Sequence, residues 1–243
     1  MTDTAVRVAM WSGPRNISTA LMRSWGNRDD TVVVDEPFYA YYLSRRPLPH
    51  PGRDEVVASQ PTRWEEVVDG LLAPLPRGAT VLYCKHMAHH LLPEIGRDWL
   101  DGVTHAFLIR DPREMLPSLA RVLPAPTLAD TGLEQQVEIY ERFAAAEAPP
   151  VVDARDVLTA PEAMLRALCD RLGVAFSERM LGWAPGLRDT DGVWARWWYD
   201  AVARSTGFAA YEPPTQPFPE HLVGLLEQCL PYYERLHRDR ITI

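Results

Sequence analysis

The stretch VRVAMWSGPRNISTALMRSWG, residues 6–26, decides the fold. Val6–Trp11 has the apolar composition of a buried strand, and the loop Ser12–Ile17 that follows it is small and polar. Ser18–Trp25 then repeats apolar side chains at helical spacing until Gly26 ends the helix. The first backbone N–H groups of such a helix lack partners within it, and the helix dipole favours negative charge there. The stretch therefore predicts a strand, loop and helix that hold a phosphate-bearing ligand.

Strands and helices continue to alternate beyond this stretch. Such alternation predicts an α/β fold with a central parallel sheet flanked by helices. Right-handed crossovers place the loop ends of several strands along one edge of the sheet, where ligands bind. The further predicted strands are Thr31–Val34, Val81–Cys84, His105–Ile109 and Val151–Asp153, and the further predicted helices are Arg63–Leu72, a helix that begins at Pro112, and Gln135–Ala146.

We expect a single domain over residues 1–243, with an α/β core in 1–176 and a helical C-terminal cap in 177–243. Arg45–Pro61 is rich in proline and arginine without periodicity, which predicts a loop or flap. The cap contains tryptophans at i, i+3 and i+4, which predict the buried stripe of a helix, with stacking on adenine or on an acceptor as the alternative: Trp194, Trp197 and Trp198.

Composition limits the function classes. With 47% hydrophobic and 24% charged residues, the chain is typical of a globular protein. A formal net charge of −8 and scattered arginines argue against nucleic-acid binding. The sequence shows neither a leader pattern nor a membrane-spanning run, so we expect a cytoplasmic protein without membrane contact. The three cysteines lack metal-ligand spacing and are predicted to be free thiols. A homodimer remains open.

The polar loop departs from the nucleotide-triphosphatase signature. Thr19 stands where that signature has its lysine, and Ala20 stands where it has the magnesium-binding hydroxyl. An ATPase or kinase is therefore disfavoured. Arg15 adds a positive charge to the loop, and Ser18 and Thr19 add hydroxyl donors. The alternative, equally weighted on this motif alone, is that Ser18 only caps the helix and Arg15 is solvated.

A second motif, FLIRDPR, occupies residues 107–113. A strand delivers Arg110 to the sheet edge, Pro112 starts a helix, and Ser118 projects from that helix. Two donors at this spacing predict a second phosphate position. The alternative, which is preferred on this motif alone, is a surface ion pair between Arg110 and Asp111 beside an ordinary helical serine.

Together the two motifs resemble the sulfotransferases that use 3′-phosphoadenosine 5′-phosphosulfate. That family has a strand followed by a Pro-Arg/Lys-x-x-Ser/Thr-Thr loop, and later an Arg-Asp-Pro strand end with a serine eight residues on. Val152–Phe176 also resembles the family's strand, acidic-Leu turn, proline, helix and Leu-Gly-hydrophobic-Phe run. The resemblance extends from about Val6 to Phe176 and more weakly beyond. It implies a three-layer fold like that of the P-loop nucleotide triphosphatases.

The resemblance also implies how the donor is bound. Pro14–Thr19 would bind the 5′-phosphosulfate, with Arg15 in the place of the family's basic residue that stabilises the bridging oxygen. Arg110 and Ser118 would bind the 3′-phosphate, and no metal is implied. The implied donor-binding set is Gly13, Pro14, Arg15, Asn16, Ile17, Ser18, Thr19, Arg110 and Ser118.

The acceptor requires a base, for which Glu36 is the leading candidate. Glu36 lies in VDEPF, residues 34–38, follows the second predicted strand, and resembles the glutamate of carbohydrate sulfotransferases. The alternative is a carboxylate that is merely favoured by a helix dipole.

The rival base lies in YCKHMAHH, residues 83–90. Cytosolic sulfotransferases have Lys-x-His here with a catalytic histidine, whereas this chain has Met87 at that place and His86 one residue earlier. A shift of one position turns a strand side chain to the opposite face. Lys85 matches the family and is expected to offset charge on the transferred group. The candidate catalytic residues are thus Glu36, Arg15, Lys85 and His86, whereas His89 and His90 are interpreted as polar helix-start residues.

The predicted function is transfer of a sulfuryl group from the phosphosulfate donor to a hydroxyl or amine of a small-molecule acceptor, by single displacement and without metal. An inactive nucleotide- or phosphate-binding regulatory protein of the same fold is the alternative. An unusual P-loop phosphotransferase is a third hypothesis, which Thr19 and Ala20 disfavour.

Overall fold

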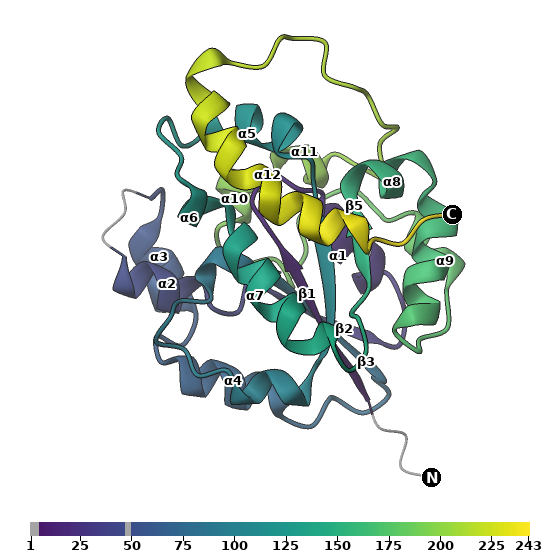
Figure 1. Cartoon of the computed structure of the whole chain (residues 1–243). Coiled ribbons are helices and arrows are strands. Elements are labelled where there is room, and N and C mark those ends of the chain that lie inside the picture. Colours follow the sequence, from purple (N-terminus) through teal and green to yellow (C-terminus); the bar gives the residue numbers. More distant parts are fainter. Residues whose placement is uncertain (1–4, 47–49) are drawn as a thin grey trace.

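The structure is a computed structural model that describes residues 5–46 and 50–243. Its centre is a five-stranded sheet in which every neighbouring pair is parallel, with the order β2-β3-β1-β4-β5 (Figure 1). The predicted strands are confirmed, although the third runs on to Met87. They are β1 (Val6–Ser12), β2 (Thr31–Asp35), β3 (Val81–Met87), β4 (Thr104–Ile109) and β5 (Val151–Asp153).

Helices flank this sheet, as predicted. Those up to the end of the core are α1 (Ser18–Gly26), α2 (Tyr39–Arg45), α3 (Arg53–Ser59), α4 (Trp64–Leu72), α5 (Pro112–Ala120), α6 (Leu128–Thr131), α7 (Leu133–Ala144), α8 (Ala154–Thr159) and α9 (Pro161–Arg171). The C-terminal segment holds α10 (Ala195–Trp198), α11 (Asp200–Ala203) and α12 (Val223–Arg238). Short 3-10 turns are η1 (Ala88–His90), η2 (Asp98–Gly102), η3 (Glu178–Leu181) and η4 (Glu220–Leu222).

The prediction of a loop over Arg45–Pro61 is wrong where α3 forms. That helix buries a single side chain, Val56, which is too little to produce helical periodicity in the sequence. Two acidic residues in its first turn match the helix dipole. Gly52 precedes it with a φ of 65°, and a Cβ there would lie 1.7 Å from the Trp197 ring, so this turn requires glycine. Residues 47–49 of the predicted loop lie outside the described residues.

The strand register assigns side chains to the two faces of the sheet. Trp11 pairs with His86 on one side and Phe107 on the other, so these three share a face. Phe107 packs edge to face against Tyr140 of α7, with ring centroids 5.6 Å apart. Tyr83 lies on the opposite face and stacks on Trp25 of α1 at 5.2 Å. Helices α1 and α7 therefore cover opposite faces, and α12 lies beside α7 (Figure 1).

The apolar core lies between these layers. The three central strands contribute fully buried side chains such as Met10, Trp11 and Phe107. Burial of each large apolar side chain stabilises the fold by about 1.5–3 kcal/mol. The three cysteines, Cys84, Cys169 and Cys229, are free, as predicted, and all three are buried.

The C-terminal segment is helical, as expected, and joins the core at two places. Arg23 of α1 donates to both carboxylate oxygens of Asp191, at 2.5 and 2.6 Å, and both side chains are almost completely buried. Further on, α12 packs on α5, α7 and β5, and Ile241 N donates to Val151 O across 2.8 Å. The predicted tryptophan stripe forms only in part, because Trp194 is buried whereas Trp197 and Trp198 are half-buried.

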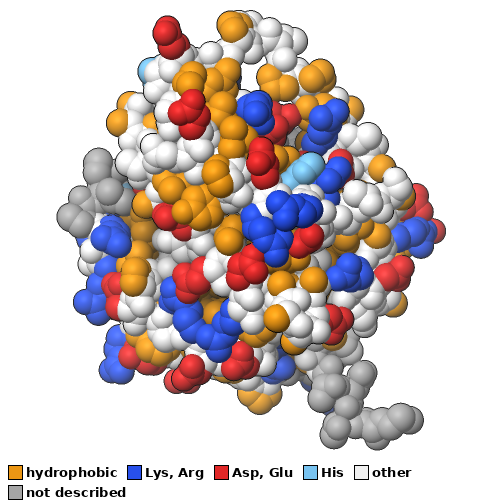
Figure 2. Space-filling model, in the orientation of Figure 1, with side chains coloured by type: hydrophobic (Ala, Val, Ile, Leu, Met, Phe, Trp, Pro, Cys, Tyr) orange, Lys and Arg blue, Asp and Glu red, His pale blue; other side chains and the backbone are white. Residues whose placement is uncertain are grey.

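The surface carries both signs of charge. On the face shown in Figure 2, Lys and Arg side chains are interspersed with Asp and Glu rather than gathered into an area of one sign. Within residues 5–46 and 50–243, none of the helices combines the length and apolar character that crossing a bilayer requires.

Candidate active site

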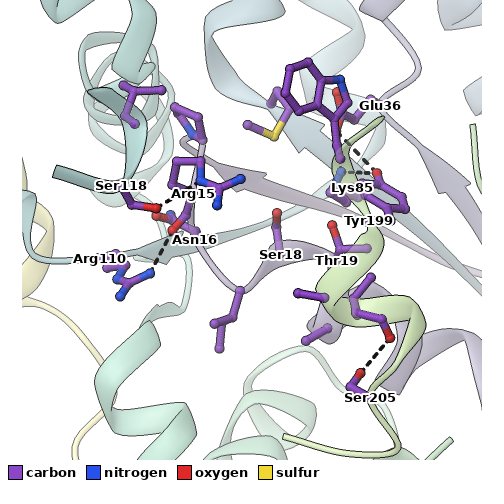
Figure 3. Close-up of a pocket in the computed structure, with 18 of the residues that line it drawn as sticks. Arg15, Asn16, Ser18, Thr19, Glu36, Lys85, Arg110, Ser118, Tyr199 and Ser205 are labelled. Atoms are coloured by element: carbon purple, nitrogen blue, oxygen red, sulfur yellow. Dashed lines mark hydrogen bonds and ion pairs between the residues drawn. The ribbon is translucent and has the colours of Figure 1, made fainter. Parts of the chain in front are cut away.

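A cavity of about 470 Å³ opens at the edge of the sheet where the strands end. Nearly all predicted site residues line it, namely Pro14, Arg15, Asn16, Ile17, Ser18, Thr19, Glu36, Lys85, Arg110 and Ser118. Figure 3 shows Arg15, Arg110 and Ser118 at one side, and Glu36, Lys85 and Tyr199 at the other, with Ser18 and Thr19 between them. Gly13 and His86 are the predicted residues that do not line it.

The loop between β1 and α1 is held by close backbone packing. A Cβ at Gly13 would lie 2.5 Å from the carbonyl oxygen of Thr131, so only glycine lets the loop approach the junction of α6 and α7. Asn16 anchors the other end, because its Nδ2 donates to Leu108 O of β4 across 3.0 Å. Between them Arg15 has a φ of 57°, a left-handed conformation that a non-glycine residue adopts at a cost.

The start of α1 faces the cavity. Ile17 occupies the N-cap position and makes no side-chain cap, so Ser18 is not the cap of this helix. The hydroxyls of Ser18 and Thr19 lie among the cavity-lining groups, beside the N–H groups that a helix start leaves unpaired. This end of the cavity is therefore suited to an anion.

Arg15 and Arg110 bring the two predicted phosphate motifs together. Arg15 Nε donates to Ser118 Oγ across 3.1 Å, and Arg110 Nη1 donates to Arg15 O across 2.9 Å. Burial lowers the pKa of Arg15, and the nearby charges of Arg110 and Arg121 lower it further. Positive charges gathered in this way favour a bound anion between them.

The predicted surface pair of Arg110 with Asp111 is not formed. Arg110 Nε instead donates to Glu114 Oε2 across 3.2 Å, one helical turn along α5. Asp111 is the N-cap of that helix and accepts a hydrogen bond from Arg113 N at 2.8 Å. Tyr211 donates to the second oxygen of Glu114 across 2.6 Å, which connects the C-terminal segment to this side of the cavity.

A buried ionic network forms the opposite side. Lys85 Nζ donates to Asp35 Oδ1 at 3.0 Å, to Tyr199 Oη at 2.8 Å, and to Glu36 Oε1. Burial opposes the charge on Lys85, but the two carboxylates raise its pKa well above the ordinary value, so it is an ammonium ion. Its three N–H donors are all directed at protein oxygens.

Tyr199 and Asp35 complete this network. The Tyr199 hydroxyl lies 2.8 and 2.7 Å from the two Asp35 oxygens and accepts a hydrogen bond from Trp194 Nε1 at 3.1 Å. The backbone N–H of Gly192 donates to Asp35 Oδ2 across 3.1 Å. The segment around residues 192–199 therefore fixes the position of the Lys85 ammonium.

Glu36 follows β2 directly and has a φ of 41°, the second left-handed non-glycine residue at this site. Burial raises the pKa of its carboxyl above the ordinary value, as does the neighbouring Asp35, although Lys85 acts in the opposite direction. Its Oε1 bonds to Lys85, and its side chain lines the cavity. The Glu36 carboxylate therefore forms an ion pair at the cavity and does not merely interact with a helix dipole.

The structure does not support His86 as a catalytic residue. Its ring is 2% exposed and stacks on Trp11 with centroids 4.3 Å apart, on the face of the sheet that α7 covers. The cause is strand alternation, since Lys85 takes the cavity face and its neighbour must take the other. Burial lowers the pKa of His86 to about 3.

Several residues of the site were not predicted from the sequence, above all Tyr39, His90 and Tyr199, which line the cavity, and Asp35, which bonds to Lys85 behind it. Asp35 precedes Glu36 at a strand end, which is a signal that could have been used. His90 was interpreted as a helix-start residue, and it does lie in η1, but that turn directs it to the cavity. Tyr199 contacts Lys85, which lies 114 residues away in the sequence, and no local sequence pattern indicates such a contact. Among the described residues, no three His, Cys, Asp or Glu side chains converge as a metal site.

Comparison with known proteins gives three findings. A family model described as "Sulfotransferase domain" matches residues 6–240. Two Arabidopsis thaliana proteins, branched-chain-amino-acid aminotransferase-like proteins 2 and 1, are 37% and 39% identical over 227 residues. These matches cover 93% of this chain but only 40% of each relative's length. A sulfotransferase structure from Alicyclobacillus acidocaldarius shares the fold, with a TM-score of 0.55, 12% identity, and coverage of 98% of this chain and 97% of that one.

Proposed function

The chain belongs to the sulfotransferase domain family, and on that premise we propose that it transfers a sulfuryl group from 3′-phosphoadenosine 5′-phosphosulfate to a hydroxyl or amine of a small-molecule acceptor in the cytoplasm. The observation that carries the proposal is the composition of one cavity. Arg110 and Ser118 at one side of it and the start of α1 in the middle would each hold an anionic group, and a buried carboxylate beside an ammonium lies at the other side.

The residues at the first side and in the middle of the cavity suit the donor. The N–H groups at the start of α1, with Ser18 and Thr19, would hold the phosphosulfate. Arg110 and Ser118 would hold the 3′-phosphate. Arg15 would lie between the two positions, because it bonds to Arg110 and Ser118 and belongs to the loop that leads into α1. The lowered pKa of Arg15 supports this assignment, since an anion would relieve the repulsion that its arginine neighbours impose.

Glu36 is the proposed base. It takes the proton of the acceptor as the new oxygen–sulfur or nitrogen–sulfur bond forms, and the bond from sulfur to the phosphate oxygen breaks with its electron pair going to the departing bisphosphate. Arg15 offsets the negative charge that grows on that oxygen. Lys85 contributes through its charge rather than through a direct bond, because Asp35, Glu36 and Tyr199 occupy its three donors.

Calorimetric titration tests the donor site. We expect adenosine 3′,5′-bisphosphate to bind with an affinity that magnesium does not change, and ATP to bind more weakly. Absence of bisphosphate binding would overturn the proposal. Binding that requires magnesium, with ATP preferred, would instead favour a phosphotransferase.

A substitution at Glu36 separates catalysis from binding. In Glu36→Gln, we expect transfer to fall by about 10²–10⁴-fold, the usual contribution of a general base, while bisphosphate affinity is kept. Glu178→Gln makes the same chemical change at an exposed position and should leave both unchanged. If the wild-type protein binds the bisphosphate but transfers no sulfuryl group from the phosphosulfate donor to any acceptor of a broad panel, the regulatory alternative replaces this proposal.

A further inference from the structure

His90 is held in an unusually fixed position beside Glu36. Its ring is 2% exposed and lies between the rings of Tyr39 and Tyr42, stacked on each with centroids 4.6 Å apart. The angles between the ring planes are 18° and 28°. This sandwich fixes the plane of the imidazole ring.

One of these nitrogens has an unused hydrogen-bonding capacity. His90 Nδ1 is buried without a hydrogen-bond partner among the described residues, and it lies 4.0 Å from Glu36 Oε2. That separation is too long for a direct hydrogen bond. Both residues line the same cavity. An unsatisfied buried nitrogen costs free energy, so its retention beside the proposed base points to a ligand.

The protonation of His90 follows from its surroundings. Burial lowers its pKa well below the ordinary value, and the nearby His89 and Lys85 lower it further, so the ring is neutral and carries one N–H. An N–H dipole directed at the Glu36 carboxylate is favourable, whereas a nitrogen lone pair directed at it is not. The proton is therefore assigned to Nδ1.

We infer that His90 Nδ1–H and Glu36 Oε2 both hydrogen-bond to the attacking atom of the acceptor, and that this pair of hydrogen bonds selects a hydroxyl over an amine. The inference rests on the proposed function. Two hydrogen bonds of about 2.8 Å to atoms at this separation meet at roughly 90° on the bound atom, which a hydroxyl oxygen accommodates. The oxygen gives its proton to Glu36 and accepts from His90 through one lone pair. Its second lone pair is left to attack sulfur.

A neutral amine cannot satisfy the same arrangement. Its nitrogen has a single lone pair, which must either accept from His90 or form the bond to sulfur. If it attacks sulfur, the His90 N–H is left without a partner in a buried site, and a buried donor without a partner disfavours that complex. An amine acceptor is therefore disfavoured. Water has two lone pairs and can make both hydrogen bonds, so we expect it to act as a slow acceptor.

The experiment compares acceptors that differ only in the attacking atom. The probes are 2-naphthol and 2-naphthylamine, both uncharged near neutral pH, together with water, whose attack appears as slow hydrolysis of the donor. In wild-type protein we expect kcat/KM for the naphthol to exceed that for the amine by about tenfold or more.

Substitutions of His90 provide the decisive comparison. His90→Phe keeps a ring between the two tyrosines but has no Nδ1, and it should lower naphthol transfer and donor hydrolysis about tenfold, with little change for the amine. His90→Asn retains an N–H near the same place and should recover part of the preference for the hydroxyl. His221→Phe, at an exposed position, should change neither.

Bisphosphate affinity, measured on each variant, shows whether the donor site is intact. The inference is overturned if wild-type protein uses the amine as well as the naphthol, or if His90→Phe with normal bisphosphate affinity leaves both the preference and the hydrolysis rate unchanged. Failure of the wild-type protein to bind the bisphosphate is a different result, which overturns the proposed function itself.

Discussion

Lys85 Nζ donates a hydrogen bond to Tyr199 Oη across 2.8 Å, and this contact joins the end of β3 to a segment 114 residues further along the chain. The same hydroxyl also bonds to Asp35 and accepts from Trp194. One phenol therefore connects the position of the ammonium to the packing of the C-terminal segment.

Tyr199→Phe removes this hydroxyl and keeps the ring. We expect the free energy of unfolding to fall by about 1–3 kcal/mol, because the buried N–H groups of Lys85 and Trp194 lose an acceptor. The value of kcat should fall as well, since the Lys85 ammonium keeps only Asp35 and Glu36 as partners. Urea unfolding and steady-state kinetics measure the two effects. Tyr232→Phe, whose hydroxyl makes only a 3.4 Å contact with Glu134, is the control. Equal effects of the two variants would contradict the prediction.

Arg110→Ala should weaken binding of adenosine 3′,5′-bisphosphate by about 10–100-fold, the effect of losing a charged hydrogen bond to phosphate. Adenosine, which lacks phosphates, should be bound equally by the variant and the wild type. Arg113→Ala removes the same charge three residues further on, in the first turn of α5, but its side chain is 54% exposed and lies outside the cavity, so affinity should be retained. Calorimetry of both variants checks the result. A similar loss in both would mean that general charge, rather than a site, attracts the ligand.

Gly13→Ala tests the close approach of the loop to Thr131. A Cβ placed 2.5 Å from a backbone oxygen forces the loop to move, and we expect a loss of about 1–3 kcal/mol in stability together with weaker bisphosphate binding. Gly70→Ala, in α4 with no atom within 4 Å of the new Cβ, should stabilise the protein by up to about 1 kcal/mol. Thermal unfolding distinguishes the two. We expect the two substitutions to change the stability in opposite directions. Changes in the same direction would contradict the packing argument.

Buried histidines predict an acid-sensitive fold. Burial lowers the pKa of His86 to about 3, and it lowers the pKa of His89 and His105 to about 4. The unfolded chain binds protons on these rings below about pH 6.5, whereas the folded protein does not, so stability is present above that pH and is lost as the pH falls toward about 4. Each such histidine contributes a slope of about 1.4 kcal/mol per pH unit. The raised pKa of Glu36 acts in the opposite sense.

Urea midpoints measured between about pH 7 and pH 5 check this slope. His86→Phe keeps the stacking on Trp11 but cannot titrate, so its midpoint should depend less steeply on pH than that of the wild type. A wild-type midpoint that is flat or rises on acidification would contradict the assignment of neutral buried rings.

The sheet and one side of the cavity could be predicted from the sequence because their signals are local. The loop between β1 and α1 has its small and polar residues in one run, and Arg110 and Ser118 are placed by a single strand end and helix. Glu36 and Lys85 also follow from strand ends. By contrast, Tyr199 and His90 depend on contacts between distant segments, for which spacing along the chain gives no signal. The place of His86 does follow from a local signal, since alternation along the strand puts it on the face opposite its neighbour Lys85.

Some inferences from the sequence remain predictions. These are the single domain with a boundary at residue 176, the assignment of individual residues to donor and acceptor, the small-molecule acceptor, the cytoplasmic location and the homodimer. Kinetic and binding measurements on the variants above address the residue assignments. Sedimentation of the purified protein addresses the oligomeric state.

The left-handed backbone at Arg15 and Glu36 has a consequence for laboratory evolution of this protein. Each position adopts a conformation that costs an ordinary residue about 1–2 kcal/mol and costs glycine almost nothing. A library screened only for heat resistance would therefore enrich glycine at position 15 and discard the guanidinium, whereas at position 36 the buried ion pair with Lys85 would keep the carboxylate. Selection for heat resistance and selection for turnover would thus oppose each other at Arg15 and agree at Glu36.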